Sequence, residues 1–106
     1  MSRIDILKSF LEENPNDSFS RYALALEYAK LEQNEDARRE LETLSKNDPN
    51  YLATYFQLAQ LYQKMSLVHE AEKTYRMGIT VAARAGELHT QSELENALNM
   101  LLGGGG

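Results

Sequence analysis

The chain has 106 residues and no cysteine, so we expect one small domain that is held together by packing rather than by disulfides. Sixteen acidic residues outnumber eleven basic ones, the net charge is −5, and no basic run exceeds Arg38-Arg39, which argues against a nucleic-acid partner. Charges interrupt the apolar positions of the first dozen residues, and neither a signal peptide nor a membrane span is recognisable there or later. We therefore expect a soluble, cytoplasmic protein without membrane contact.

The first expected helix lies within residues 2–15, where apolar side chains recur at helical spacing. Ser2 is a competent N-cap, and Pro15 ends the pattern because a residue that precedes proline is driven out of the helical region. We interpret this helix as a cap over the apolar end of the segment that follows. Its apolar residues are Ile4, Leu7, Phe10 and Leu11.

Residues 18–51 are expected to form two helices, joined by a short turn at Gln33-Asn34 and ended by Pro49. N-cap residues at positions 16–18 precede the first helix. The apolar stripe consists of Tyr22, Leu24, Ala25, Tyr28 and Leu31 in the first helix, and of Ala37, Leu41 and Leu44 in the second. The charged residues Arg38, Arg39, Glu40 and Glu42 are interpreted as the solvated face of the second helix.

Residues 52–85 are expected to form a second pair of helices, with a turn near Ser66-Leu67. Gly86 is the natural end of this pair, because glycine accepts the left-handed conformation at least cost. The inward positions are Tyr55, Leu58, Ala59, Tyr62 and Met65 in the first helix, and Ala71, Tyr75 and Ile79 in the second.

A last helix is expected over residues 87–102, where Leu94 and Leu98 would lock it onto the preceding pair. The other apolar residues of this helix are Leu88, Ala97, Leu101 and Leu102. Glu87, Glu93, Glu95, Asn96 and Asn99 keep its other side polar, which is the profile of a solvating cap. The glycines at 103–106 cannot pack, and we expect a flexible tail there.

Residues 18–51 are nearly repeated by residues 52–85 at an offset of 34 positions. The identical pairs are Leu24 and Leu58, Ala25 and Ala59, Tyr28 and Tyr62, Lys30 and Lys64, and Ala37 and Ala71. A period of this length with helical spacing inside it indicates a stacked array of helix-turn-helix units.

These residues resemble the tetratricopeptide repeat family. Its first helix carries a large apolar residue, a small one beside it and an aromatic three positions later, as in Leu24-Ala25 with Tyr28. Its second helix carries alanine and then a bulky residue four positions later, and proline closes the repeat, as Pro49 does. The chain departs from the pattern at Arg21, where a large apolar residue is usual, at Gly78, where alanine is usual, and at Ala83, where proline would end the second repeat.

The resemblance implies an all-α fold of six helices, stacked as a short right-handed solenoid. It would comprise a half-repeat over residues 2–15, repeat one over 18–51, repeat two over 52–85 and a capping helix over 87–102, within a single domain of residues 1–102. Because no proline replaces Ala83, the last helix of repeat two should run on to about Arg84.

In this family the first helix of each repeat lines a concave surface, and helical periodicity directs a set of residues toward it. The candidate groove consists of Phe19, Tyr22, Leu26, Phe56, Gln57, Gln60 and Gln63. Clustered exposed aromatic residues mark contact sites. The alternative is that Tyr22 and Phe56 simply pack against neighbouring helices.

Some members of the family hold the acidic C-terminal tail of a chaperone through a basic clamp on this surface. Where the clamp places lysine and asparagine, this chain has Tyr22 and Leu26, and Gln57 replaces a further asparagine. The resemblance therefore does not extend to that mode of binding.

No catalytic constellation, cofactor motif or metal site is recognisable in the sequence. His89 and Glu93 lie four positions apart on one helix face, but two ligands without a third do not make a metal site. No carboxylate is expected on a buried face, where desolvation would suit it for acid-base catalysis.

The resulting functional prediction is a protein-interaction module that binds a peptide or a protein surface in the groove, without catalysis. The alternative is a scaffold protein that self-assembles through the groove or the end helices, because two repeats bury little surface. An enzyme would need a buried polar pocket, for which the sequence offers no candidate residues.

Overall fold

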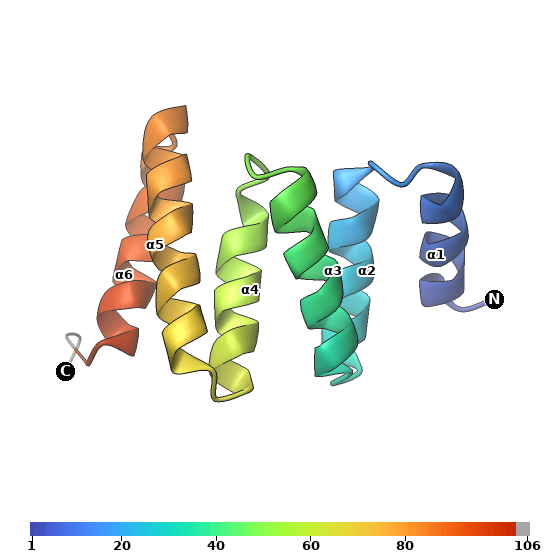
Figure 1. Cartoon of the computed structure of the whole chain (residues 1–106), viewed down its shortest axis with the longest axis horizontal. Coiled ribbons are helices and arrows are strands. Elements are labelled where there is room, and N and C mark those ends of the chain that lie inside the picture. Colours follow the sequence, from blue (N-terminus) through green and yellow to red (C-terminus); the bar gives the residue numbers. More distant parts are fainter. Residues whose placement is uncertain (104–106) are drawn as a thin grey trace. The chain divides into compact units, whose positions relative to one another are not determined.

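The computed structural model describes residues 1–103, and within them it contains six α-helices and no strand (Figure 1). The helices are α1 (Arg3–Glu13), α2 (Ser18–Lys30), α3 (Asn34–Asn47), α4 (Ala53–Lys64), α5 (Val68–Ala85) and α6 (Leu88–Leu101). The all-α class and the order of the helices are as predicted. The expectation of a flexible tail concerns residues 103–106, of which 104–106 lie outside the described residues. No helix in residues 1–103 is both long enough and apolar enough to cross a membrane.

The chain divides into two compact units, Met1–Thr54 and Tyr55–Gly106, which we call the N-terminal and C-terminal units. In the N-terminal unit α2 packs against both α1 and α3, and in the C-terminal unit α5 packs against α6 (Figure 1).

The N-terminal unit buries most of the predicted stripe. Leu24, Ala25, Ala37, Leu41 and Leu44 are each at most 2% exposed, and Leu11 of α1 joins them. Tyr28, which was expected in this core, is only half-buried, and Leu31, which was expected in the same stripe, is 58% exposed at the C-cap of α2. Glu27, the neighbour of Tyr28, forms an ion pair with Arg3, the first residue of α1, at 3.3 Å.

The C-terminal unit is built around two fully buried tyrosines, Tyr55 of α4 and Tyr75 of α5. A Cβ atom at Gly78 would lie 2.6 Å from the Cβ of Tyr55 and 3.0 Å from Cδ1 of Leu94. The departure from alanine at Gly78 is therefore explained by a close approach of α5 to both α4 and α6. Ile79, expected to point inward, is half-buried, because the buried row of α5 passes through position 78 instead.

Three helices end in the same hydrogen-bonded turn, at Glu32, Ser66 and Gly86, where φ is 58°, 64° and 72°. After α2, Gln33 N donates to Tyr28 O and Glu32 N to Ala29 O, and the same pattern follows α4 and α5. Gly86 was predicted at such an end, whereas Glu32 and Ser66 were not, because neither is a glycine. Helix α5 extends to Ala85, one residue beyond the predicted Arg84.

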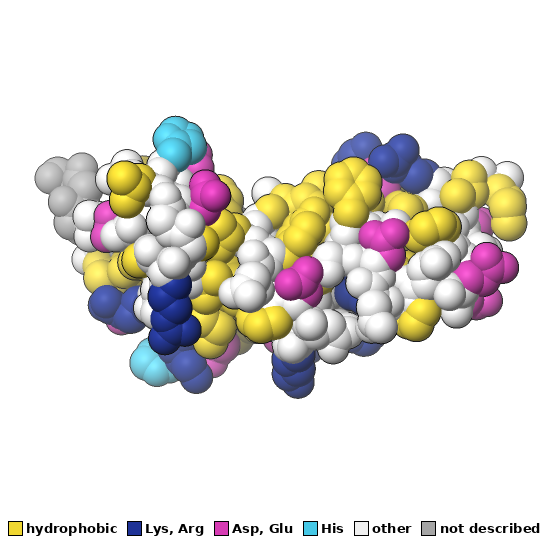
Figure 2. Space-filling view, turned by 90° about the horizontal axis from the view of Figure 1, so that it is seen from above, with side chains coloured by type: hydrophobic (Ala, Val, Ile, Leu, Met, Phe, Trp, Pro, Cys, Tyr) yellow, Lys and Arg dark blue, Asp and Glu magenta, His cyan; other side chains and the backbone are white. Residues whose placement is uncertain are grey.

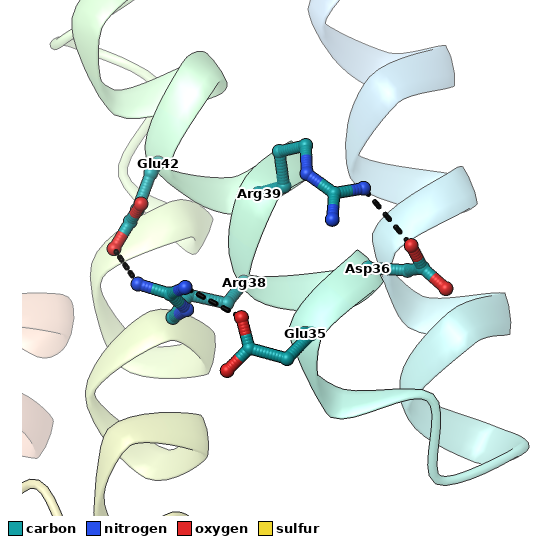
Figure 3. A network of polar contacts seen from close by, with 5 residues as sticks. All are labelled: Glu35, Asp36, Arg38, Arg39 and Glu42. Carbon is teal, nitrogen blue, oxygen red and sulfur yellow. Dashed lines mark hydrogen bonds and ion pairs between the residues drawn. The ribbon is translucent and has the colours of Figure 1, made fainter.

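Charged residues of α3 follow two different patterns. Figure 3 shows Arg38 between Glu35 and Glu42, and Arg39 beside Asp36. Arg39 is 66% exposed, as expected of a solvated face, whereas Arg38 and Glu42 are 35% and 36% exposed. Glu40 is an exception to the prediction that this face of α3 is wholly solvated. Its carboxylate accepts a hydrogen bond from Arg21 at 2.7 Å, and the two side chains are only 18% and 17% exposed.

Arg21 also donates to the carbonyl oxygen of Pro15 at 3.0 Å. It thereby joins α2 to α3 and to the loop that follows α1. This explains why a long cation occupies a position where the family prefers an apolar residue.

Candidate functional site

The N-terminal unit holds three of the predicted groove residues, all on α2. Phe19 is 72% exposed, whereas Tyr22 and Leu26 are half-buried. The ring of Tyr22 packs against that of Tyr51, with centroids 5.6 Å apart. The alternative prediction had Tyr22 pack against a neighbouring helix, whereas Tyr51 lies in the connection that follows α3. Burial raises the pKa of the Tyr51 hydroxyl, and the carboxylates of Asp48 and Asp17 raise it further.

The C-terminal unit holds the other four predicted residues, all on α4, and brings three of them together. Phe56, Gln60 and Gln63 line one pocket, while Gln57 lies outside its lining. Their spacing of four and three positions places them on one face of the helix. Phe56 contacts Tyr75 of α5 edge to face, with ring centroids 6.3 Å apart.

The hydroxyl of Tyr75 joins the two glutamines in a hydrogen-bonded chain. Gln60 Nε2 donates to Tyr75 Oη at 3.2 Å, and Tyr75 Oη donates to Gln63 Oε1 at 2.6 Å. Gln60 keeps its carbonyl oxygen as an acceptor, and Gln63 keeps its amide group as a donor. Burial raises the pKa of Tyr75, against a smaller lowering by the hydrogen bond from Gln60, so the hydroxyl stays protonated at neutral pH.

Helix α6 supplies the opposite wall of the pocket, which the sequence analysis missed. The wall consists of Glu93, Asn96, Ala97 and Met100, and the pocket has a volume of about 360 Å³. Glu93 and Asn96 were assigned to the solvated side of a capping helix, and Met100 was not singled out. A signal was present, because positions 93, 97 and 100 share one helix face.

The core sets the rotation of α6, and thereby the position of this wall. Leu94 and Leu98 are 1% and 7% exposed, as predicted for the residues that lock the helix. Leu94 reaches into the space above Gly78, which lacks a side chain. With Leu94 and Leu98 facing the core, their neighbours Glu93 and Ala97 are placed at the edge of the pocket.

The imidazole of His89 lies near the pocket, with Nε2 3.7 Å from Oε1 of Glu93. Both side chains are exposed, as expected of a pair four positions apart on a helix surface. Within residues 1–103 no group of three or more His, Asp or Glu side chains is arranged to hold a metal ion.

No protein-family model and no curated protein sequence matches the chain. Its structure matches the solution structure of a tetratricopeptide repeat domain protein from Salinibacter ruber, with a TM-score of 0.81, 38% identity, and coverage of 84% of this chain and 90% of that one. A crystal structure of a tetratricopeptide repeat domain protein from Salinibacter ruber matches with a TM-score of 0.78 and 38% identity over 82% of this chain and 98% of that one.

The TPR2B domain of yeast Sti1, in its complex with pHsp70, has the same fold with a TM-score of 0.84. Its identity is 17%, and the match covers 92% of this chain and 78% of that one. The two Salinibacter structures combine the shared fold with substantial sequence identity over most of both chains. The chain therefore belongs to the tetratricopeptide repeat family.

Proposed function

We propose that this protein is a protein-interaction module that binds a peptide segment in the pocket of the C-terminal unit, without catalysis. The observation that carries the proposal is the hydrogen-bonded chain of Gln60, Tyr75 and Gln63, which lies beside the apolar side chains of Phe56 and Met100. This chain holds the Gln60 carbonyl oxygen as an acceptor and the Gln63 amide group as a donor beside an apolar wall.

A peptide matches this arrangement because its backbone offers a donor and an acceptor at each residue. Gln60, Gln63 and Asn96 can pair with those groups without requiring a charge. At about 360 Å³ the pocket is at the small end of ligand sites, which suits one or two side chains of an extended segment. Met100 is 73% exposed, and its flexible thioether side chain adapts to different apolar partners.

The three groove residues of α2 enter the proposal as a second contact surface, on which Phe19 is the most exposed aromatic side chain. Figure 2 shows hydrophobic side chains among charges of both signs on the face that it presents, without a broad field of one sign. The Sti1 domain, which shares the fold, is an example of a member in complex with a protein ligand.

The test is selection of peptides on the purified protein, followed by affinity measurement with two matched variants. Met100→Ala removes a side chain from the pocket, whereas Met77→Ala removes an exposed methionine of α5 that does not line the pocket. We expect Met100→Ala to weaken binding about fivefold to tenfold, in the range of a single contact residue, and Met77→Ala to leave it unchanged. Equal effects of the two variants, or no selectable peptide, would contradict the proposal.

Self-assembly remains the second candidate, and α1 carries the observation that favours it. Ile6 and Phe10 are 54% and 43% exposed and lie four positions apart on one helix face. A second copy of the chain could cover this face. Sedimentation equilibrium would show a mass that rises with concentration if it does, and a constant monomer mass if it does not.

A further inference from the structure

We infer that the peptide side chain seated beside α6 is a lysine or an arginine, whose cationic group pairs with Glu93. This inference rests on the proposed function, because it specifies which segment the pocket prefers.

The charge of the pocket carries the inference. Among its eight lining residues Glu93 is the only charged one, and no Lys or Arg of the C-terminal unit is among them. Arg76, one of those cations, pairs with Glu72 at 2.9 Å along α5. A carboxylate brought into the pocket would meet a like charge with no Lys or Arg in the lining to offset it, whereas an ammonium or guanidinium group would meet its counter-charge.

Glu93 is available to such a partner. Among the ion pairs and close charge contacts of residues 1–103, Glu93 appears once, with Oε1 at 3.7 Å from Nε2 of the His89 imidazole. The Glu93 side chain is 57% exposed and the His89 side chain 89% exposed, so a ligand can approach the carboxylate without breaking a buried contact.

The surroundings of Glu93 favour a long cationic side chain over a free ion. Ala97 and Met100 follow Glu93 at four and seven positions, so the three lie in a row along α6. The methylene stem of lysine or arginine can lie over this apolar row while its charged end reaches the carboxylate. An apolar residue adjacent to it in the peptide would then contact Phe56 on the opposite wall.

The test is an NMR titration with three capped nine-residue peptides that differ only at the central position, which is lysine, norleucine or glutamate and is followed by leucine. Norleucine matches the stem of lysine and lacks its charge. We expect the lysine peptide to bind about threefold more tightly than the norleucine peptide, as for one exposed ion pair, and the glutamate peptide to bind most weakly. Raising the salt concentration should reduce this preference.

Two variants test whether the preference for lysine over norleucine comes from Glu93. Glu93→Gln should bring the ratio of lysine to norleucine affinities to about one, while Glu95→Gln, on the same helix but outside the pocket, should leave the wild-type ratio unchanged. Equal binding of the lysine and norleucine peptides, or a preference that survives Glu93→Gln, would overturn the inference and leave the proposed function standing. If none of the three peptides bound, both would fail.

Discussion

Single residues explain where this chain departs from its family. Arg21 replaces an apolar residue because it pairs with Glu40, and Gly78 replaces alanine because Tyr55 and Leu94 occupy the space of a methyl group. Glu32 and Ser66 hold positive φ angles at equivalent positions of the two repeats, although neither is the residue that this conformation favours.

Replacing Ser66 with glycine should raise the free energy of unfolding by about 0.5 to 1 kcal/mol, because glycine adopts φ near 64° without the steric cost of a Cβ atom. Urea unfolding followed by circular dichroism measures the change. Ser92→Gly is the matched control, since Ser92 is exposed within α6 and glycine should destabilise the helix there. A loss of stability in Ser66→Gly would contradict the assigned turn.

Replacing Gly78 with alanine should lower the free energy of unfolding by about 1 to 3 kcal/mol through overpacking against Tyr55 and Leu94. Helix propensity alone gives the opposite sign, a gain of about 1 kcal/mol. Thermal and urea unfolding therefore distinguish overpacking from helix propensity by the sign of the change in the free energy of unfolding. A more stable Gly78→Ala protein would show that α5 does not approach α4 and α6 as closely as described.

At the scale of helices, the sequence predicts which helices exist and in what order. It predicts less well how each helix is rotated about its own axis. Apolar spacing and turn residues predicted all six helices, four of them within the repeat at an offset of 34 positions, because these are local signals. The wall formed by α6 was missed, because Asn96 and Glu93 are polar and polar residues at a helix surface usually face only water. Their role depends on packing of Leu94 and Leu98, which only the folded unit reveals.

The ion pair between Arg21 and Glu40 should stabilise the contact of α2 with α3. A double-mutant cycle with Arg21→Ala and Glu40→Ala should give a coupling of about 1 kcal/mol or more, since both side chains are largely shielded from water. The same cycle on Arg39 and Asp36, which are 66% and 41% exposed, should give about 0.3 kcal/mol. Equal couplings would mean that Glu40 is solvated, as the sequence alone suggested.

At the scale of the whole molecule, two compact units carry different parts of the candidate site. The N-terminal unit presents Phe19 on α2, and the C-terminal unit presents the pocket between α4 and α6, with Tyr75 of α5 holding its glutamines. Four of the seven predicted groove residues lie on α4, and three of these line the pocket. Helical periodicity grouped these three residues because they share one face of α4. The acidic and apolar residues that complete the pocket come from α6, which the sequence analysis predicted to be a capping helix.

The central claim is that a peptide binds in the pocket of the C-terminal unit, and chemical-shift mapping with a selected peptide tests it most directly. The side-chain amide signals of Gln60, Gln63 and Asn96 should shift on titration, because these residues line the pocket. The amide of Gln91, which interacts with Glu95 outside the pocket, should stay in place. The account would be contradicted if the shifts were confined to α1. It would also be contradicted if the peptide bound and the side-chain amide signals of the pocket residues did not shift.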